Sequence, residues 1–279
     1  MKLAFSTNAY TKHTLSHALR GIRAAGFEAV EILADSPHAY PELIDDTLIR
    51  SVRAELQELG LSVSNVNANC TFGYWRHAPP EPYFEPSLIS PEPAYRADRI
   101  RLVKRTLDFA AGIDAPCISI TSGRCLGPID PRRAGELFVE GIKPILDHAD
   151  KVGVNVGIEC EPGLFVEWAS ELSGWIQRIN HPRLGANLDI GHSVVLGEGI
   201  DAPLRTLRDK VWNMHVEDLP GTKHYHMIPG TGSFDWTTLK HTLTDIHYDR
   251  HLTVELYTQT EHPQDAAEQS FAFLSELFR

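Results

Sequence analysis

Short apolar runs alternate along this chain with longer segments in which apolar residues recur at helical spacing. Leu48, Val52, Leu56 and Leu59 show this spacing in one such segment, as expected for a helix that buries one face. The pattern predicts strands at residues 2–8, 29–35, 62–69, 117–122, 155–161, 185–189, 211–217 and 251–256. It predicts helices at residues 14–25, 45–59, 94–111, 132–151, 167–179, 202–210, 236–246 and 265–278. Eight strand–helix pairs in 279 residues are typical of a closed (β/α)8 barrel, so we expect an α/β protein with one domain over residues 1–279.

The connection at residues 71–93 departs from this regular pattern. It holds six prolines, which disfavour regular structure, together with several aromatic residues. Loops of this length in a compact domain are usually functional or disordered, and aromatic side chains favour order. We therefore expect the loop to form a wall or lid over the barrel mouth, with Trp75 in contact with the substrate. A packed surface loop, or a contact between subunits, is the alternative interpretation. The aromatic residues are Phe72, Tyr74, Trp75, Tyr83 and Phe84.

Composition and charge narrow the classes of function. The hydrophobic and charged fractions, 42% and 23%, are ordinary for a globular protein. A formal net charge of −11 disfavours binding to nucleic acid, whose phosphates attract basic surfaces. No apolar run approaches the ~20 residues that a membrane span needs, and the N-terminus lacks the pattern of a signal peptide. We therefore expect a cytoplasmic protein without membrane or nucleic-acid partners, in which the four cysteines are reduced thiols because they form no CxxC pair.

Polar residues gather at the ends of the last four predicted strands, where the active site of such a barrel lies. These strands end in acidic residues or histidine. Acidic side chains on neighbouring strands repel one another, and burial of a carboxylate costs several kcal/mol unless it is paired or coordinated. A bound divalent cation resolves the repulsion, since carboxylates and imidazole are ligands of Mn²⁺, Zn²⁺, Co²⁺ and Mg²⁺. An ion-pair network without a metal is the alternative.

The same strand ends carry sequence motifs that resemble one known family. In chain order they are IECEPGLFVE at 158–167, NLDIGHS at 187–193, MHVED at 214–218, IPGTGSFDW at 228–236 and TVELY at 253–257. Their ordered set resembles the sugar phosphate isomerase/epimerase family, also called the xylose isomerase-like TIM barrels, over nearly the whole chain. The resemblance implies one divalent metal ion, with Mn²⁺ favoured and Zn²⁺, Co²⁺ or Mg²⁺ as alternatives. It implies that the metal ligands are Glu159, Asp189, His215 and Glu255.

The resemblance also implies residues that contact the substrate beside the metal. Glu161 lies two residues beyond Glu159 and has the same facing on a strand, so it is the substitute ligand and a predicted substrate contact. His192 resembles a histidine that contacts substrate near the metal in this family. A solvent-exposed loop histidine is the alternative interpretation of His192.

Further contacts are expected from loops around the mouth. A basic residue before the turn at Gly230 often touches substrate in the family, and we expect His226 in this role. His38, which follows the second strand, is a candidate substrate contact or else a surface loop residue. Asn8 and Asn67 follow the first and third strands and could line the mouth.

These residues predict a metal-dependent isomerase or epimerase that acts on a sugar-like hydroxycarbonyl compound. The metal would polarise the carbonyl and stabilise an enediolate, while Glu159 and Glu255 remove and return the proton on carbon. One alternative is a biosynthetic or binding protein on the same barrel with a changed reaction. A phosphodiesterase resembling the endonuclease IV branch is less favoured, because an Asp-x-His sequence after the seventh strand is missing. The expected partner is a small sugar-like molecule, and lid loops that often meet a partner subunit in such barrels are compatible with a homo-oligomer.

Overall fold

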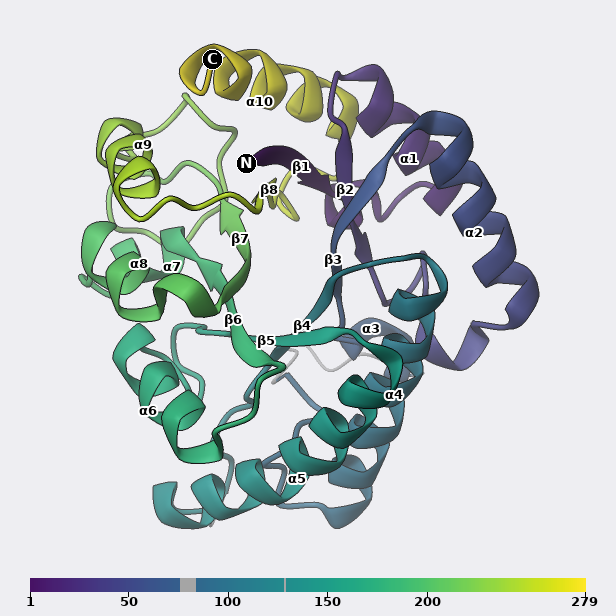
Figure 1. Cartoon of the computed structure of the whole chain (residues 1–279), viewed down its shortest axis with the longest axis vertical. Coiled ribbons are helices and arrows are strands. Elements are labelled where there is room, and N and C mark those ends of the chain that lie inside the picture. Colours follow the sequence, from purple (N-terminus) through teal and green to yellow (C-terminus); the bar gives the residue numbers. More distant parts are fainter. Residues whose placement is uncertain (76–83, 128) are drawn as a thin grey trace.

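The predicted strands form a closed parallel barrel in the computed structural model, which describes residues 1–75, 84–127 and 129–279. Each strand pairs with the next one in the chain, and the last pairs with the first to close the ring (Figure 1). The single (β/α)8 barrel predicted from the sequence is therefore confirmed. The strands are β1 (Lys2–Ser6), β2 (Ala29–Leu33), β3 (Ser62–Asn67), β4 (Cys117–Thr121), β5 (Asn155–Glu159), β6 (Leu184–Asp189), β7 (Val211–Val216) and β8 (His251–Val254).

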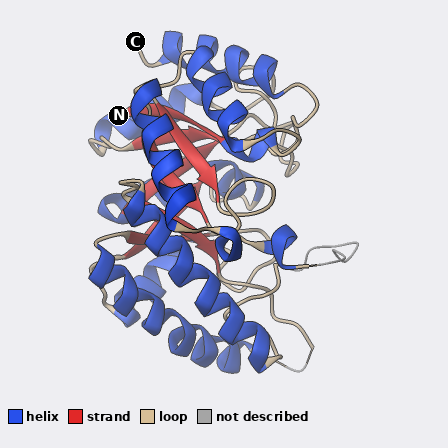
Figure 2. Ribbon diagram, turned by 90° about the vertical axis from the view of Figure 1, so that its right-hand side faces the viewer, coloured by secondary structure: helices blue, strands red, loops and turns tan. Residues whose placement is uncertain are grey.

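Helices surround the barrel and cover its outer face (Figure 1, Figure 2). Along the part of the chain that the structure describes, no helix combines the length and apolar character needed to cross a bilayer. The α-helices are α1 (Leu15–Ala24), α2 (Asp46–Leu59), α3 (Thr71–Tyr74), α4 (Pro93–Gly112), α5 (Pro131–Val152), α6 (Ala169–Ile179), α7 (Ile190–Val195), α8 (Asp201–Leu207), α9 (Trp236–Asp245) and α10 (Pro263–Leu277). Short 3-10 helices are η1 (Thr7–Tyr10), η2 (Pro41–Leu43) and η3 (Arg208–Lys210).

Aspartate side chains begin several of these helices. Asp45 accepts a hydrogen bond from the backbone N–H of Leu48 at the start of α2. Asp130 and Asp235 cap α5 and α9 in the same way. A carboxylate at this position satisfies a backbone N–H that has no partner within the helix and complements the positive end of the helix dipole. These caps fix where each helix starts after its strand-end loop.

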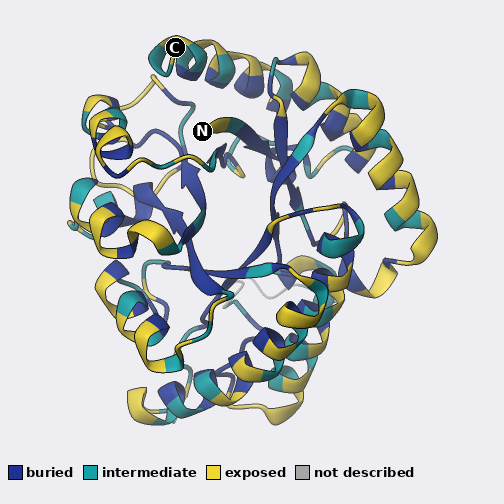
Figure 3. Ribbon diagram, viewed as in Figure 1, coloured by how far each residue is buried: buried dark blue, intermediate teal, exposed yellow. Residues whose placement is uncertain are grey.

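The interior of the barrel carries a layer of polar side chains beneath the strand ends. Figure 3 shows that the strands are buried and that the outer faces of the helices are exposed. Glu31, Asn65, Asn187, Asn213 and His215 are each at most 1% exposed, and hydrogen bonds join them to one another. Buried polar groups need such partners because water does not reach them. The layer forms a hydrogen-bonded floor under the mouth of the barrel.

Helix α7 was not predicted from the sequence. It begins directly after β6, and its six residues are too few to show a helical repeat of apolar positions. Asp189, which the sequence analysis assigns only to the metal, also caps this helix, because its Oδ1 accepts a hydrogen bond from the backbone N–H of His192 at 3.0 Å. The cap places His192 one turn above the end of β6.

The predicted loop at residues 71–93 begins with a short helix at the barrel mouth. The carboxylate of Asp35 accepts hydrogen bonds from the backbone N–H groups of Phe72 and Gly73, at 2.8 and 2.6 Å, and so fixes α3 beside the end of β2. Residues 76–83, which include Tyr83, lie outside the described residues. The helix predicted from residue 94 begins at Pro93.

Candidate active site at the strand ends

The four predicted metal ligands come together at one rim of the barrel. Glu159 ends β5, Asp189 ends β6, His215 is the last but one residue of β7, and Glu255 follows β8 directly. One ligand atom from each lies within 4.8 Å of the ligand atoms of the other three, and all four residues are buried. The register explains this convergence, because Asp189 stands opposite His215 on the neighbouring strand.

This donor set fits a divalent cation. Three carboxylates and one imidazole lie together and are buried, and each buried carboxylate is costly unless it is paired or coordinated. Oδ2 of Asp189 has no hydrogen-bond partner among the described residues, although it is fully buried. Oxygen and imidazole donors are those that Mn²⁺, Zn²⁺, Co²⁺ and Mg²⁺ take in proteins.

His215 lies at the centre of the cluster with carboxylates on both edges of its ring. Its Nδ1 is 2.8 Å from Glu159 Oε1, and its Nε2 is 2.6 Å from Glu31 Oε2. Burial alone would lower the pKa of this imidazole, but the surrounding carboxylates of Glu255, Glu31 and Glu159 raise it well above its usual value. Glu31 was not predicted from the sequence, where its only signal is a single acid inside the apolar run of β2.

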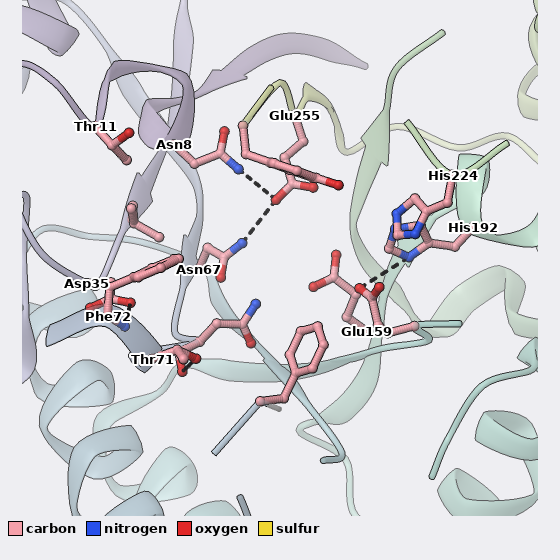
Figure 4. A pocket seen from close by; sticks show the side chains of 15 residues that line it. Asn8, Thr11, Asp35, Asn67, Thr71, Phe72, Glu159, His192, His224 and Glu255 are labelled. Carbon is pink, nitrogen blue, oxygen red and sulfur yellow. Dashed lines mark hydrogen bonds and ion pairs between the residues drawn. The ribbon is translucent and has the colours of Figure 1, made fainter. Parts of the chain in front are cut away.

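One carboxylate oxygen of Glu255 accepts hydrogen bonds from two side-chain amides. The side chains of Asn8 and Asn67 donate to its Oε1 at 2.9 and 3.3 Å, and Figure 4 shows both amides pointing toward this carboxylate. Both asparagines line the cavity at the mouth, as the sequence analysis expects. Burial, together with the neighbouring carboxylates, raises the pKa of Glu255 well above its usual value.

Glu159 and Glu161 line the cavity from the end of β5. The amide of Asn187 donates to Glu159 Oε1 at 3.0 Å, so that this oxygen is held by the floor of the barrel. Glu161 also lines the cavity, and burial raises its pKa to about 7. Its Oε2 lies 3.7 Å from His192 Nδ1. The structure therefore places Glu159 within the ligand cluster and Glu161 beside it.

His192 lies in the cavity wall above Asp189. Its Nδ1 is 3.0 Å from the backbone oxygen of Cys160, and its Nε2 is 3.5 Å from Asp189 Oδ2. Burial disfavours the charged ring, but Asp189 and Glu161 outweigh it and raise the pKa of His192 to about 9. The ring of His224, which also lines the cavity, stands edge-on to His192 at 4.5 Å between centroids.

His226 is fully buried behind this wall and is not among the described residues that line the cavity. Its Nδ1 donates to the backbone oxygen of Glu255 at 2.8 Å. Burial lowers its pKa to about 4. Glu217, another residue that the sequence analysis did not single out, lies close to His226 and Asp189, and burial raises its pKa well above the usual value.

Like His226, the predicted substrate contacts His38 and Trp75 lie off the cavity, which makes three such residues among those that the structure describes. His38 is buried, with Nδ1 3.1 Å from Thr7 Oγ1 and Nε2 3.2 Å from the backbone oxygen of Tyr10. The indole N–H of Trp75 donates to the backbone oxygen of Glu85 at 3.1 Å, and its ring packs against Tyr95. The loop residues that do line the cavity include Phe72 and Phe84.

The cavity at the mouth has a volume of about 330 Å³, within the range of small-molecule sites. Glu159, Glu161, His192 and Glu255 line one part of it. The apolar part of the wall consists of Leu33, Phe72, Phe84 and Tyr257. No lysine or arginine is found among the lining residues in the described ranges.

Comparison with known proteins agrees with this fold. The chain is 22% identical over 262 residues to fructoselysine 3-epimerase of Escherichia coli O157:H7, a match that covers 92% of this chain and 91% of that protein. D-psicose 3-epimerase of Clostridium cellulolyticum H10, solved with D-tagatose, shares the fold with a TM-score of 0.79 at 17% identity over 100% of both chains. The IOLI protein, solved with a zinc atom, shares it with a TM-score of 0.80 at 16% identity over 100% of this chain and 98% of that one. Residues 19–277 match the family described as xylose isomerase-like TIM barrel, and the chain therefore belongs to this family.

Proposed function

We propose that this protein is a metal-dependent epimerase or isomerase of a small, sugar-like hydroxycarbonyl compound. The observation that carries the proposal is the position of Glu159 and Glu255, two carboxylates that belong to one ligand cluster and line the same cavity from different sides of the barrel. The similarity to fructoselysine 3-epimerase, which extends over most of both chains, supports an epimerase in particular.

Glu159, Asp189, His215 and Glu255 would hold one divalent ion, with Mn²⁺ favoured and Zn²⁺, Co²⁺ or Mg²⁺ as alternatives. Such an ion acts as a Lewis acid that polarises a carbonyl and stabilises the negative charge that develops on its oxygen. The IOLI protein, which shares this fold, was solved with a zinc atom, and this is compatible with a divalent ion in the present chain.

The two glutamates would move the proton on the substrate carbon. One oxygen of each carboxylate is held by amide donors: Glu159 Oε1 by Asn187 and Glu255 Oε1 by Asn8 and Asn67. These bonds orient two carboxylates that reach the cavity from β5 and from the end of β8. A base on one face of a carbon and an acid on the other remove and return a proton with inversion, which is the reaction of an epimerase. We further propose that Glu161 and His192 bind substrate hydroxyl groups, since both line the cavity.

The lining of the cavity favours a substrate without a phosphate group. Sites for phosphate use Arg or Lys side chains or a helix N-terminus, whereas the lining residues that the structure describes carry amides, carboxylates and imidazoles. Asn8, Asn67 and Asn69 offer both donors and acceptors to hydroxyl groups. The apolar side chains of the wall can pack on the C–H face of a sugar.

A substrate panel tests this proposal. The Mn²⁺-loaded protein would be incubated with free ketoses, their phosphate esters and amino-acid conjugates of ketoses, and the products would be identified by NMR. Conversion of a free or conjugated ketose to its epimer, abolished by a chelator and restored by Mn²⁺, is the expected result. Conversion of the phosphate esters alone would contradict the proposed substrate class, and a dehydrated product would point to a changed reaction.

A further inference from the structure

Glu31 is a fully buried carboxylate that stands behind the ligand cluster. It lies on β2 and is neither part of the four-residue cluster nor one of the described residues that line the cavity. Its Oε2 is 2.6 Å from His215 Nε2 and 2.7 Å from Asn65 Nδ2. A carboxylate accepts hydrogen bonds and does not donate them. His215 Nε2 and Asn65 Nδ2 therefore both donate to Glu31, and Nε2 of His215 carries a proton.

The two edges of the His215 ring face different carboxylates: Nε2 faces Glu31, which lies outside the ligand cluster, and Nδ1 faces the cluster itself. Nδ1, on the other edge of the ring, lies 2.8 Å from Glu159 Oε1 and 3.5 Å from Glu255 Oε2. A neutral imidazole with its proton on Nε2 has its lone pair on Nδ1, and the lone pair is what binds a metal. We propose that Glu31 is a positioning residue that holds the proton of His215 on Nε2 and so presents Nδ1 as the metal-binding atom. The inference rests on the metal site of the proposed function.

The neighbours of Glu31 support this role. Asn65 fixes the same carboxylate oxygen that accepts from His215, and Ser119 accepts a second hydrogen bond from the Asn65 amide at 2.8 Å. The carboxylate is thus held in place from β3 while it holds a ring on β7. A carboxylate behind a histidine ligand fixes the orientation of the ring and raises the basicity of the nitrogen that binds the metal.

The ligand atom can be read directly in the wild-type protein. Protein labelled with ¹⁵N-histidine would be loaded with Zn²⁺, and His215 would be assigned by comparison with His215→Gln. The proposal expects a metal-bound Nδ1 and a protonated Nε2 in the ¹⁵N spectrum. A metal-bound Nε2 would overturn it.

A pair of variants tests the part played by Glu31. Glu31→Gln removes the negative charge with little change of shape, and the Kd for Zn²⁺ should rise roughly 10- to 100-fold, the usual effect of losing such a partner. Ser64→Ala is the matched control. It removes another fully buried polar group of the barrel interior, which accepts a hydrogen bond from Thr253 Oγ1 at 3.1 Å, and does not touch His215.

We expect the control to lower the unfolding temperature and leave the Kd unchanged. An equal loss of affinity in both variants, or wild-type affinity in Glu31→Gln, would contradict the role of Glu31. If Glu31→Gln fails to fold, the spectrum of the wild-type protein still decides which nitrogen binds. An enzyme with Nδ1 ligation that converts no hydroxycarbonyl compound would contradict the proposed function and leave this inference standing.

Discussion

The side-chain amide of Asn8 donates a hydrogen bond of 2.9 Å to Glu255 Oε1, which joins residues 247 positions apart in the chain. Asn8 follows β1 and Glu255 follows β8, the two strands whose pairing closes the barrel. Asn67 donates to the same oxygen from the end of β3. Closure of the barrel and orientation of a candidate catalytic carboxylate therefore depend on the same pairing.

Asn8→Ala should lower kcat without a matching loss of stability. A hydrogen bond to a charged group contributes about 1.5–3 kcal/mol, so we expect roughly a 10- to 100-fold fall in kcat if the bond holds Glu255 in its working position. Asn67→Ala should have a smaller effect, because its bond is longer, at 3.3 Å. Steady-state kinetics and thermal unfolding of both variants would check this. Wild-type kcat in Asn8→Ala would show that the bond does not orient the carboxylate.

Protein purified without chelator should carry a divalent metal, which elemental analysis would detect. Asp189→Ala should abolish tight binding, since Asp189 supplies one of four ligands and also caps α7. Asp209→Ala serves as the control, because the Asp209 side chain is 93% exposed. A metal-free protein that takes up neither Mn²⁺ nor Zn²⁺ would rule out the ligand set.

Phe72 and Trp75 belong to two different parts of the aromatic loop, one that lines the cavity and one that packs away from it. Phe72 lines the cavity and is 61% exposed, so Phe72→Ala should raise KM roughly 5-fold at constant kcat, as expected when about 1 kcal/mol of uniform binding is lost. Trp75 packs on Tyr95 and lies off the cavity, and Trp75→Ala should change KM less. A larger rise of KM in Trp75→Ala than in Phe72→Ala would support the contact between Trp75 and the substrate that the sequence predicts.

His251 should make the protein less stable in weak acid. It begins β8, away from the cavity, and burial with the nearby charges of Lys2 and the N-terminus lowers its pKa from 6.5 to about 4. The unfolded chain therefore binds the proton more readily, and stability falls as the pH drops from about 6.5 to about 4. Unfolding temperatures at pH 7 and pH 5 should differ less in His251→Gln than in the wild type. If the two unfolding temperatures differ as much in His251→Gln as in the wild type, the lowered pKa of His251 is contradicted.

The barrel and the ligand set could be predicted from the sequence because both leave local signals. Each strand is a short apolar run followed by a segment of helical period, and each predicted ligand lies at or near the end of such a run. Parallel pairing then brings the ends of successive strands to one rim without any knowledge of side-chain contacts.

The residues that hold the ligands and the aromatic loop in place left no comparable signal in the sequence. Glu31 is one acid inside the run AVEIL, and its partner His215 is 184 positions away. Trp75 was predicted to touch substrate from its residue type, but its direction is set by Tyr95 and the backbone of Glu85, which only the folded loop brings together. Helix α7 was missed because its six residues are too few to show a helical repeat and because its cap, Asp189, was assigned only to the metal.

Exchange of the carbon-bound hydrogen of the substrate with solvent deuterium tests the two-glutamate proposal most directly. The wild-type protein, Glu159→Gln and Glu255→Gln would be incubated with the best ketose substrate in D₂O, each with saturating Mn²⁺, and exchange would be followed by NMR. A positioned acid or base contributes ~10²–10⁴-fold to the rate, so exchange should be seen in the wild type and reduced at least about 100-fold in the variant that lacks the base. The variant that lacks the acid should form epimer at least about 100-fold more slowly. Exchange and epimer formation at wild-type rates in either variant would show that the substituted glutamate is a ligand only and would contradict the proposal.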